Sequence, residues 1–241
     1  MKLTKDIFDS ILRGAYSTCE DEYGRLCTQR FTDRQKEIIA RRCPNNIYQH
    51  PGMRLDFFTD AESISMAFGY AHFTTRIFMS IDIYEDGVMT YSYVEKNAFD
   101  AHRGEITFAF EKKGRKRVTV YLPFSLELAF ERIELTGESY IEPYTDYSGY
   151  VWMMGDSITH GYDAQITSQS YATIAMRRLD LDGINQGAAG KEPCHDLDRG
   201  GGVDVGVGLF FVEGEIVLQI QKQHHSHVGG GGGFLGSRGQ N

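Results

Sequence analysis

The sequence predicts a chain of the α/β class in which an antiparallel, jelly-roll-like β-sandwich precedes an incomplete α/β/α domain. Three observations lead to this prediction. Residues 53–135 hold many short segments of alternating apolar and polar residues with turn signals between them. Residues 150–185 instead hold a continuous apolar run, a polar loop, a helical pattern and a short strand, which open a parallel α/β unit. Residues 191–241 are rich in glycine and show no further alternation of this kind.

Two short helices are expected before the alternating segments. The second runs over residues 33–42, has Thr32 or Asp33 as its cap, and ends before Pro44, whose ring cannot continue a helix. The first is indicated by four apolar residues that fall on one helical face: Leu3, Ile7, Ile11 and Leu12.

The alternating region predicts a series of short strands. Asp86-Gly87 is a strong hairpin signal, and Lys113-Gly114 marks a second turn within the basic run 112–117, which we interpret as a solvated hairpin. A further strand is expected at 126–130, and residues 133–135 would form another. The earlier strands are expected near residues 53–57, 64–70, 77–83, 89–93, 106–110 and 118–122.

The second part begins after residues 142–149, which have the composition of a linker or an edge segment. The apolar run 150–154 predicts a strand that is buried on both faces of a parallel sheet. A helix follows, with Ser168 or Ser170 as its cap, and then a short strand at 182–185. We therefore divide the chain into a β-sandwich domain with short leading helices, residues 1–148, and an α/β domain, residues 149–241. Within the tail 191–241 we expect weak packing and one strand over 210–220. The predicted inner face of the helix is Tyr171, Ile174, Ala175 and Leu179.

Composition excludes several classes of function. The net charge of −8 argues against nucleic acid as a partner, because phosphate binding needs a basic surface. Neither a signal peptide nor a run of about 18 apolar residues is found, so a cytoplasmic protein without a membrane partner is expected. The four cysteines lack C-x-x-C spacing, which favours reduced thiols. No metal site is expected, and the oligomeric state is not determined by the sequence.

Candidate chemistry lies in the loop 155–161, directly after the buried strand. Ser157 would project from the carboxyl end of a parallel strand, into the crevice where α/β proteins bind ligands. Backbone N–H groups of the loop and of the following turn could then face a developing oxyanion. Asp156 would hold the loop by accepting backbone N–H bonds. The loop is not a G-x-S-x-G elbow, because Thr159 stands at the second glycine position.

The segment Gly155-Asp156-Ser157-Ile158-Thr159-His160-Gly161 resembles the first signature block of the GDSL/SGNH hydrolases. Residues 185–190, Asn-Gln-Gly-Ala-Ala-Gly, are similar to the second block of that family. Residues 14–31, 51–60 and 117–123 are similar to a small β-sandwich that precedes the hydrolase domain in a bacterial subgroup and in two-domain carbohydrate esterases. The resemblance covers roughly residues 5–190.

The resemblance implies a serine esterase of small acyl esters, with acetylated carbohydrates as the favoured substrate class and with no cofactor or metal. It implies Ser157 as the nucleophile and the N–H groups of Ser157 and Gly190 as the oxyanion hole. Asp156 would support the loop, and His160 would line the site.

The chain departs from the family after Gly190. The family's third block, G-x-N-D, and its last block, D-x-x-H, are not found, so the triad Asp and His are not identified. A truncated or frame-shifted sequence would explain this. His160 and His195 are the alternatives as a base, and both are weak candidates because sequence proximity does not ensure geometry. The rival hypothesis is a catalytically inactive fragment whose β-sandwich is a carbohydrate-binding module. A third is a product whose C-terminal part never folds.

Overall fold

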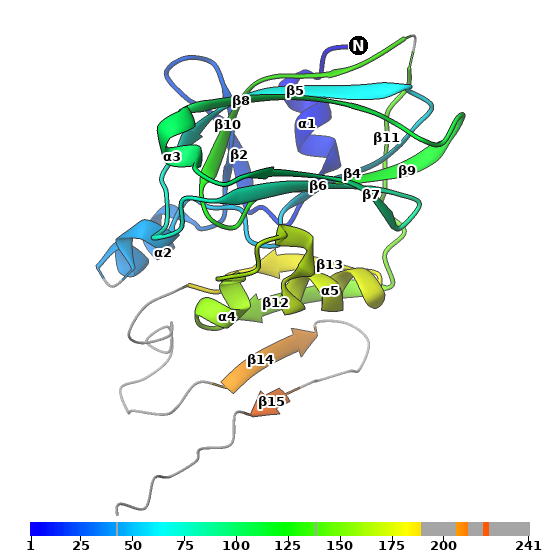
Figure 1. Cartoon of the computed structure of the whole chain (residues 1–241). Coiled ribbons are helices and arrows are strands. Elements are labelled where there is room, and N and C mark those ends of the chain that lie inside the picture. The colour runs from blue at the N-terminus through cyan, green and yellow to red at the C-terminus, as the bar shows by residue number, and fades with distance from the viewer. Residues whose placement is uncertain (42, 138, 189–205, 212–218, 222–241) are drawn as a thin grey trace, which may run out of the picture.

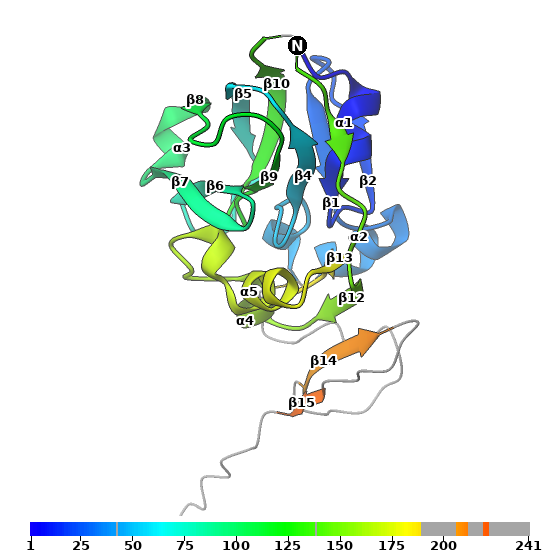
Figure 2. The same cartoon turned by 90° about the vertical axis from the view of Figure 1, so that its right-hand side faces the viewer.

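The computed structural model describes residues 1–41, 43–137, 139–188, 206–211 and 219–221, the last two ranges as backbone only. It contains a mixed α/β fold with mostly antiparallel sheets and few helices. Figures 1 and 2 show two large sheets that lie one above the other, with a smaller sheet and two helices below them.

The two large sheets are antiparallel throughout. Strand order in the lower sheet is β1 (Leu12–Arg13), β4 (Arg54–Thr59), β9 (Lys116–Tyr121), β6 (Met79–Glu85) and β7 (Val88–Glu95), with β11 (Glu142–Pro143) also on β4. Strand order in the upper sheet is β2 (Ser17–Glu20), β3 (Leu26–Gln29), β10 (Glu127–Leu135), β5 (Ser63–Ala71) and β8 (Arg103–Ala109).

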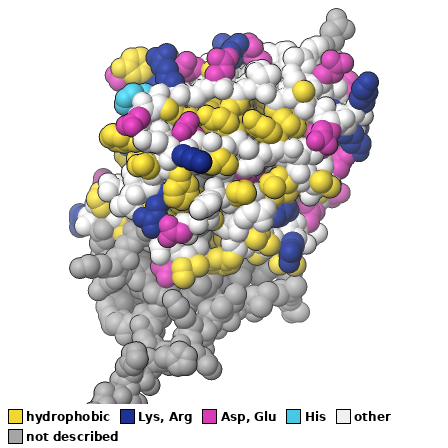
Figure 3. Space-filling model, in the orientation of Figure 1, with side chains coloured by type: hydrophobic (Ala, Val, Ile, Leu, Met, Phe, Trp, Pro, Cys, Tyr) yellow, Lys and Arg dark blue, Asp and Glu magenta, His cyan; other side chains and the backbone are white. Residues whose placement is uncertain are grey.

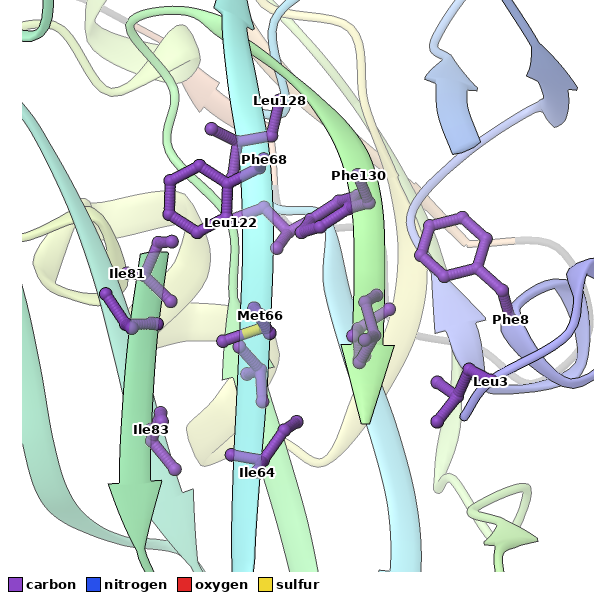
Figure 4. Packing of buried hydrophobic residues seen from close by; sticks show 14 of the residues in the cluster. Leu3, Phe8, Ile64, Met66, Phe68, Ile81, Ile83, Leu122, Leu128 and Phe130 are labelled. Carbon is purple, nitrogen blue, oxygen red and sulfur yellow. The ribbon is translucent and has the colours of Figure 1, made fainter. Parts of the chain in front are cut away.

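The main hydrophobic core fills the space between these sheets (Figure 4). Ile64, Met66 and Phe68 of β5 face Ile81 and Ile83 of β6, and all five are essentially unexposed. The alternation in the sequence therefore places one set of apolar side chains inward, as the period of two requires. A second set of core residues, from the N-terminus and from the later strands, includes Leu3, Phe8, Leu122, Leu128 and Phe130.

The two predicted N-terminal helices are present. Helix α1 spans Lys5–Ile11 and has Thr4 as its N-cap. Helix α2 spans Asp33–Ala40, where Thr32 and Gln35 form a reciprocal capping box. A 3-10 helix then runs over Pro44–Asn46, and a one-turn helix, α3, spans Ala98–Ala101.

The two turn signals have different outcomes. Asp86 and Gly87 both have positive φ and join β6 to β7 as a two-residue hairpin, which confirms that prediction. The hairpin expected at Lys113-Gly114 is wrong, because β8 and β9 lie in different sheets and the turn crosses between them. The basic run there is only partly solvated. Lys116 is buried, and its Nζ donates to the carbonyl oxygen of Ala61 at 2.7 Å.

The two strands expected at 126–130 and 133–135 are one strand, β10. Its register on β5 shifts between Phe130 and Arg132, which is a β-bulge at Glu131. The extra residue reverses the parity of the strand, so Phe130 and Ile133 both face the core. A bulge, and not a loop, therefore interrupts the apolar–polar alternation of residues 126–135.

The third sheet has the order β13-β12-β14-β15. Strand β12 (Gly149–Met154) is parallel to β13 (Leu181–Asn185), as the sequence predicts, whereas β14 (Gly206–Phe211) is antiparallel to β12. The single strand expected over 210–220 is instead two strands, β14 and β15 (Gln219–Gln221), which pair with each other. The remaining expectations for the tail lie outside the described residues.

Strand β12 is not buried on both faces. Val151 and Met153 are buried, but Tyr150 is 43% and Trp152 41% exposed. Helix α5 (Tyr171–Arg178) lies on one face of the small sheet, in front of it in Figure 1, and Val151 and Met153 pack against the helix on that face.

The inner face of α5 also differs from the predicted one. Ser170 caps the helix as expected, but the buried residues are Ala172, Thr173 and Met176, while Leu179 is 49% exposed. The methyl group of Met176 reaches the backbone of Gly52, so the helix packs toward the large sheets as well as toward β13. Because α5 also contacts the region of Gly52, its buried face differs from the face that packing against the small sheet alone would bury.

Buried charges join the lower large sheet to the small one. Asp56 is unexposed and accepts two hydrogen bonds from Arg117, at 2.9 and 2.8 Å. Arg117 also pairs with Asp180 at 3.3 Å, and Arg54 donates to the carbonyl oxygen of Leu181 at 3.0 Å. Burial alone would raise the pKa of Asp56, but the hydrogen bonds from Arg117 and the charge of Arg54 hold it below its ordinary value.

The surface shown in Figure 3 mixes apolar, acidic and basic side chains. No helix in the described part of the chain has the length and apolar character that crossing a bilayer requires. Cys19 and Cys27 are free thiols, and Cys194 lies outside the described residues.

Candidate active site

Ser157 is the first residue of α4 (Ser157–His160), a single turn that two residues, Gly155 and Asp156, separate from the end of β12. Asp156 is the N-cap, and its Oδ1 accepts the N–H of Ile158 at 2.9 Å. Gly161 closes the turn in the left-handed region, with φ of 100°. The Ser157 side chain is therefore held at the carboxyl end of a strand by short local contacts, and it is partly exposed.

Gly155 is required by space. A Cβ at this position would lie 2.2 Å from Oγ1 of Thr159, which is buried and shares a 2.7 Å hydrogen bond with the hydroxyl of Tyr171. The turn α4 thus packs directly onto the end of β12 and onto α5.

The loop after β13 lies beside the loop that carries Ser157. The side-chain amide of Asn185 donates to the carbonyl oxygen of Thr159 at 2.7 Å, and the N–H of Ala188 donates to the carbonyl oxygen of Gly155 at 3.0 Å. Asn185 Oδ1 also accepts the N–H of Gly187 at 2.9 Å. A Cβ at Gly187 would lie 2.4 Å from the backbone nitrogen of His160, so only glycine permits this approach.

His160 lies between the two loops and the large sheets. Its Nδ1 is 3.0 Å from the carbonyl oxygen of Gly187, and its Nε2 is 2.9 Å from that of Phe124. Burial and the charge of Arg30 lower its pKa to about 3. A neutral imidazole has a single N–H, so His160 donates to one of these two carbonyl oxygens, while Nη1 of Arg30 lies 3.5 Å from Nδ1. We infer that His160 holds the loops together and is not placed to take a proton from Ser157.

Arg30, which follows β3, is the main contact that the sequence analysis did not identify. Its side chain is 1% exposed, and Nη1 donates to the carbonyl oxygen of Gly187 at 3.0 Å, while Nη2 donates to that of Asn46. No spacing in the sequence relates Arg30 to a residue 157 positions away. An arginine beside the apolar Phe31 was the one available signal.

The remaining site predictions are placed as follows. Ser157 Oγ has no hydrogen-bond partner among the described residues. Its N–H belongs to the first turn of α4 and has no acceptor within the helix. Gly190 and His195 lie outside the described residues. Within the described ranges, no group of three His, Cys, Asp or Glu side chains converges in a way that could hold a metal ion.

Comparison with solved structures identifies proteins of similar architecture. A salicylyl-acyltransferase from a tetracycline biosynthetic pathway is 23% identical, with a TM-score of 0.63 over 74% of this chain and 51% of its own. A protein from Bacteroides ovatus described as a GDSL-like lipase is 16% identical, with a TM-score of 0.56 over 76% and 55%. A family two carbohydrate esterase from Clostridium thermocellum, in complex with cellohexaose, is 12% identical, with a TM-score of 0.50 over 74% and 50%.

The chain spans about half the length of these solved structures. No family model and no curated protein matches its sequence. At these identities the likeness concerns the fold, and it covers about three quarters of this chain. The chain is therefore similar in fold to these solved structures, which include a GDSL-like lipase and a carbohydrate esterase.

Proposed function

We propose that the chain is a serine esterase of the GDSL/SGNH type that hydrolyses small acyl esters. The observation that carries the proposal is the position of Ser157, on the first turn after a parallel strand and beside the hydrogen-bonded loop of the neighbouring parallel strand. Such a position presents a nucleophile and backbone N–H groups to the same ligand atom.

In the proposed reaction, Ser157 Oγ attacks the ester carbonyl and its proton passes to a base. The N–H groups of Ser157 and Gly190 stabilise the oxyanion, and Asp156 keeps the turn in place. The alcohol then leaves with a proton, and water hydrolyses the acyl-enzyme to regenerate Ser157. We propose His195, which lies outside the described residues, as the base to test, since both ring nitrogens of His160 face backbone carbonyl oxygens.

For the substrate we propose acetylated carbohydrates. The support is that one solved structure of similar fold is a carbohydrate esterase in complex with cellohexaose, and that another is an acyltransferase. We further propose that residues 1–148 form a jelly-roll-like β-sandwich domain and residues 149–241 an incomplete α/β/α hydrolase domain.

The decisive experiment measures hydrolysis of p-nitrophenyl acetate by the purified chain, by Ser157→Ala and by Ser65→Ala. Ser65 lies on β5 and bonds to Thr107, so its variant controls for loss of a serine elsewhere. We expect Ser157→Ala to lose the rate above background and Ser65→Ala to retain it. Acetylated xylan and acetylated cello-oligosaccharides, with acetate release as the readout, test the substrate class.

A second candidate function is favoured by one observation, namely that Ser157 has no hydrogen-bonded base among the described residues. In that case the chain is an inactive hydrolase whose β-sandwich binds carbohydrate. Equal rates for the wild type and Ser157→Ala, together with saturable binding of a cello-oligosaccharide, would support this candidate against the esterase.

A further inference from the structure

A cavity of about 290 Å³ opens on the outer side of the upper large sheet. Its walls come from the β2–β3 hairpin, from α2, from the segment before β4 and from the adjoining ends of β5 and β10. All of its lining residues lie between positions 19 and 129, so the cavity shares none with the loops that carry Ser157.

Glu127, the first residue of β10, lines this cavity and is the unusual group in it. Its side chain is 9% exposed, yet no hydrogen bond to its carboxylate is formed within the described part of the chain. The nearest basic atom is Nε2 of His72, at 3.6 Å. A buried carboxylate is costly unless it is paired and hydrogen-bonded, so Glu127 lacks what such a group normally has.

The basic groups around the cavity are already engaged, and two further carboxyl groups, those of Asp21 and Glu22, also line it. Arg25 binds Asp21 through Nε at 2.6 Å, and Lys36 of α2 pairs with Asp33 at 3.2 Å. Burial lowers the pKa of His72, so its imidazole is neutral at pH 7 and supplies no positive charge. Among the described residues, no lysine or arginine nitrogen lies within 4.0 Å of Glu127. Burial, the larger effect, and the negative charge of Asp21 together raise the pKa of Glu127 to about 7.

One wall of the cavity is aromatic. The ring of Tyr48 stacks on that of His72, with their centroids 4.0 Å apart, and both residues line the cavity with Glu127. Apolar and aromatic surface beside an acidic group suits a ligand with an apolar body and a positive charge, because aromatic faces attract cations.

We propose that this cavity binds a small primary ammonium ion with an apolar body, with Glu127 as its counter-ion and Tyr48 as its aromatic wall. The ammonium group donates hydrogen bonds to the carboxylate that no residue of the described chain supplies. The site is separate from the proposed esterase function and does not depend on it.

The test uses benzylammonium chloride as the probe and benzyl alcohol as its uncharged counterpart of the same size. Calorimetric titration is done at roughly pH 8, one unit above the pKa of Glu127. We expect saturable binding of benzylammonium, with benzyl alcohol weaker by about tenfold or more. Glu127→Gln keeps the shape but removes the charge, and it should weaken benzylammonium binding by about tenfold. Glu131→Gln, a carboxyl further along β10, is the matched control and should bind as the wild type does.

Two further measurements keep the proposal falsifiable if Glu127→Gln does not fold. Tyr48→Leu should weaken binding, and the wild type at roughly pH 5, where Glu127 carries a proton, should lose it. The proposal is overturned by the absence of saturable benzylammonium binding, by equal affinity for benzyl alcohol, or by unchanged affinity in a folded Glu127→Gln. If cellobiose binds and benzylammonium does not, the proposal is overturned and the cavity is assigned to a neutral sugar.

Discussion

Nη1 of Arg30 and the carbonyl oxygen of Gly187 lie 3.0 Å apart, although 157 positions separate the two residues. The contact joins the end of β3 in the upper large sheet to the loop beside Ser157. Because a second carbonyl, that of Asn46, accepts from the same guanidinium, one side chain ties two loops together. The large sheets therefore help to hold the candidate active site, and the site's geometry depends on both parts of the chain.

Replacing Arg30 by methionine should be strongly destabilising. The variant keeps the apolar stem but leaves two buried carbonyl oxygens without their donor, so we expect a loss of about 3 kcal/mol in the free energy of unfolding. Arg103→Met is the control, because that side chain is 77% exposed and should change stability by less than about 0.5 kcal/mol. Urea unfolding followed by circular dichroism measures both. Equal midpoints for the two variants would contradict the role given to Arg30.

Gly187→Ala tests the close approach of the two loops. The added methyl group would lie 2.4 Å from the backbone nitrogen of His160, and backbone cannot move aside cheaply. We expect a cost of about 2 kcal/mol or more. Gly137→Ala is the comparison, since Gly137 has a φ of 77° but open space around its Cβ, and it should cost about 1 kcal/mol. A smaller loss at Gly187 than at Gly137 would show that the loops are not packed in this way.

Asp56→Asn should weaken the buried ion pairs that join the small sheet to the large ones. The variant leaves Arg54 and Arg117 without their buried counter-charge, at a cost of about 3 kcal/mol near neutral pH. The pKa of Asp56 is lowered from 3.8, so its contribution is present above that value and is lost as pH falls below it. The stability difference between variant and wild type should therefore shrink in strong acid. Asp163→Asn, an exposed carboxyl, should show no comparable loss.

Helices and hairpins could be predicted well because residues close together in the sequence determine them. The β6–β7 hairpin needs only Asp86-Gly87, and the start of α2 needs only Thr32 and Gln35, so short segments were sufficient. The predicted position of Ser157 also follows from one strand and its loop. Short strands such as β2 and β3 were missed, although the turn Asp21–Gly24 between them was a usable signal.

The errors arose where the cause was not local. The inner face of α5 is chosen by contact with Gly52, far away in the sequence, and the burial of Lys116 depends on the carbonyl of Ala61. The roles of Arg30 and Asp56 likewise exist only once two sheets meet. Periodicity carries no information on such pairings, so the residues that hold the candidate site in place could not be predicted from it.

His160→Gln should change how stability depends on pH. In the folded chain the pKa of His160 is about 3, against 6.5 for the free group, so the unfolded state binds a proton first as the solution is acidified. The wild type should therefore lose stability between pH 6.5 and 3, by up to about 1.4 kcal/mol per pH unit from this residue. The variant lacks this slope, although it is less stable at neutral pH. His102→Gln is the control for the loss of an exposed histidine.

Glu127→Gln should have the opposite effect on the pH profile. Burial raises the pKa of Glu127 from 4.5 to about 7, so the folded chain keeps its proton where the unfolded chain has released it. Wild-type stability should consequently fall as pH rises from 4.5 to 7 and stay level above that, with a total effect of a few kcal/mol by order of magnitude. The variant has no charge to bury, so it should be the more stable protein near roughly pH 8 and lose that advantage near pH 4. Glu131→Gln is the control for the loss of an exposed carboxyl group on the same strand. Parallel pH profiles for wild type and Glu127→Gln would mean that Glu127 is solvated or already paired, which would also remove the basis for an ammonium ligand beside it.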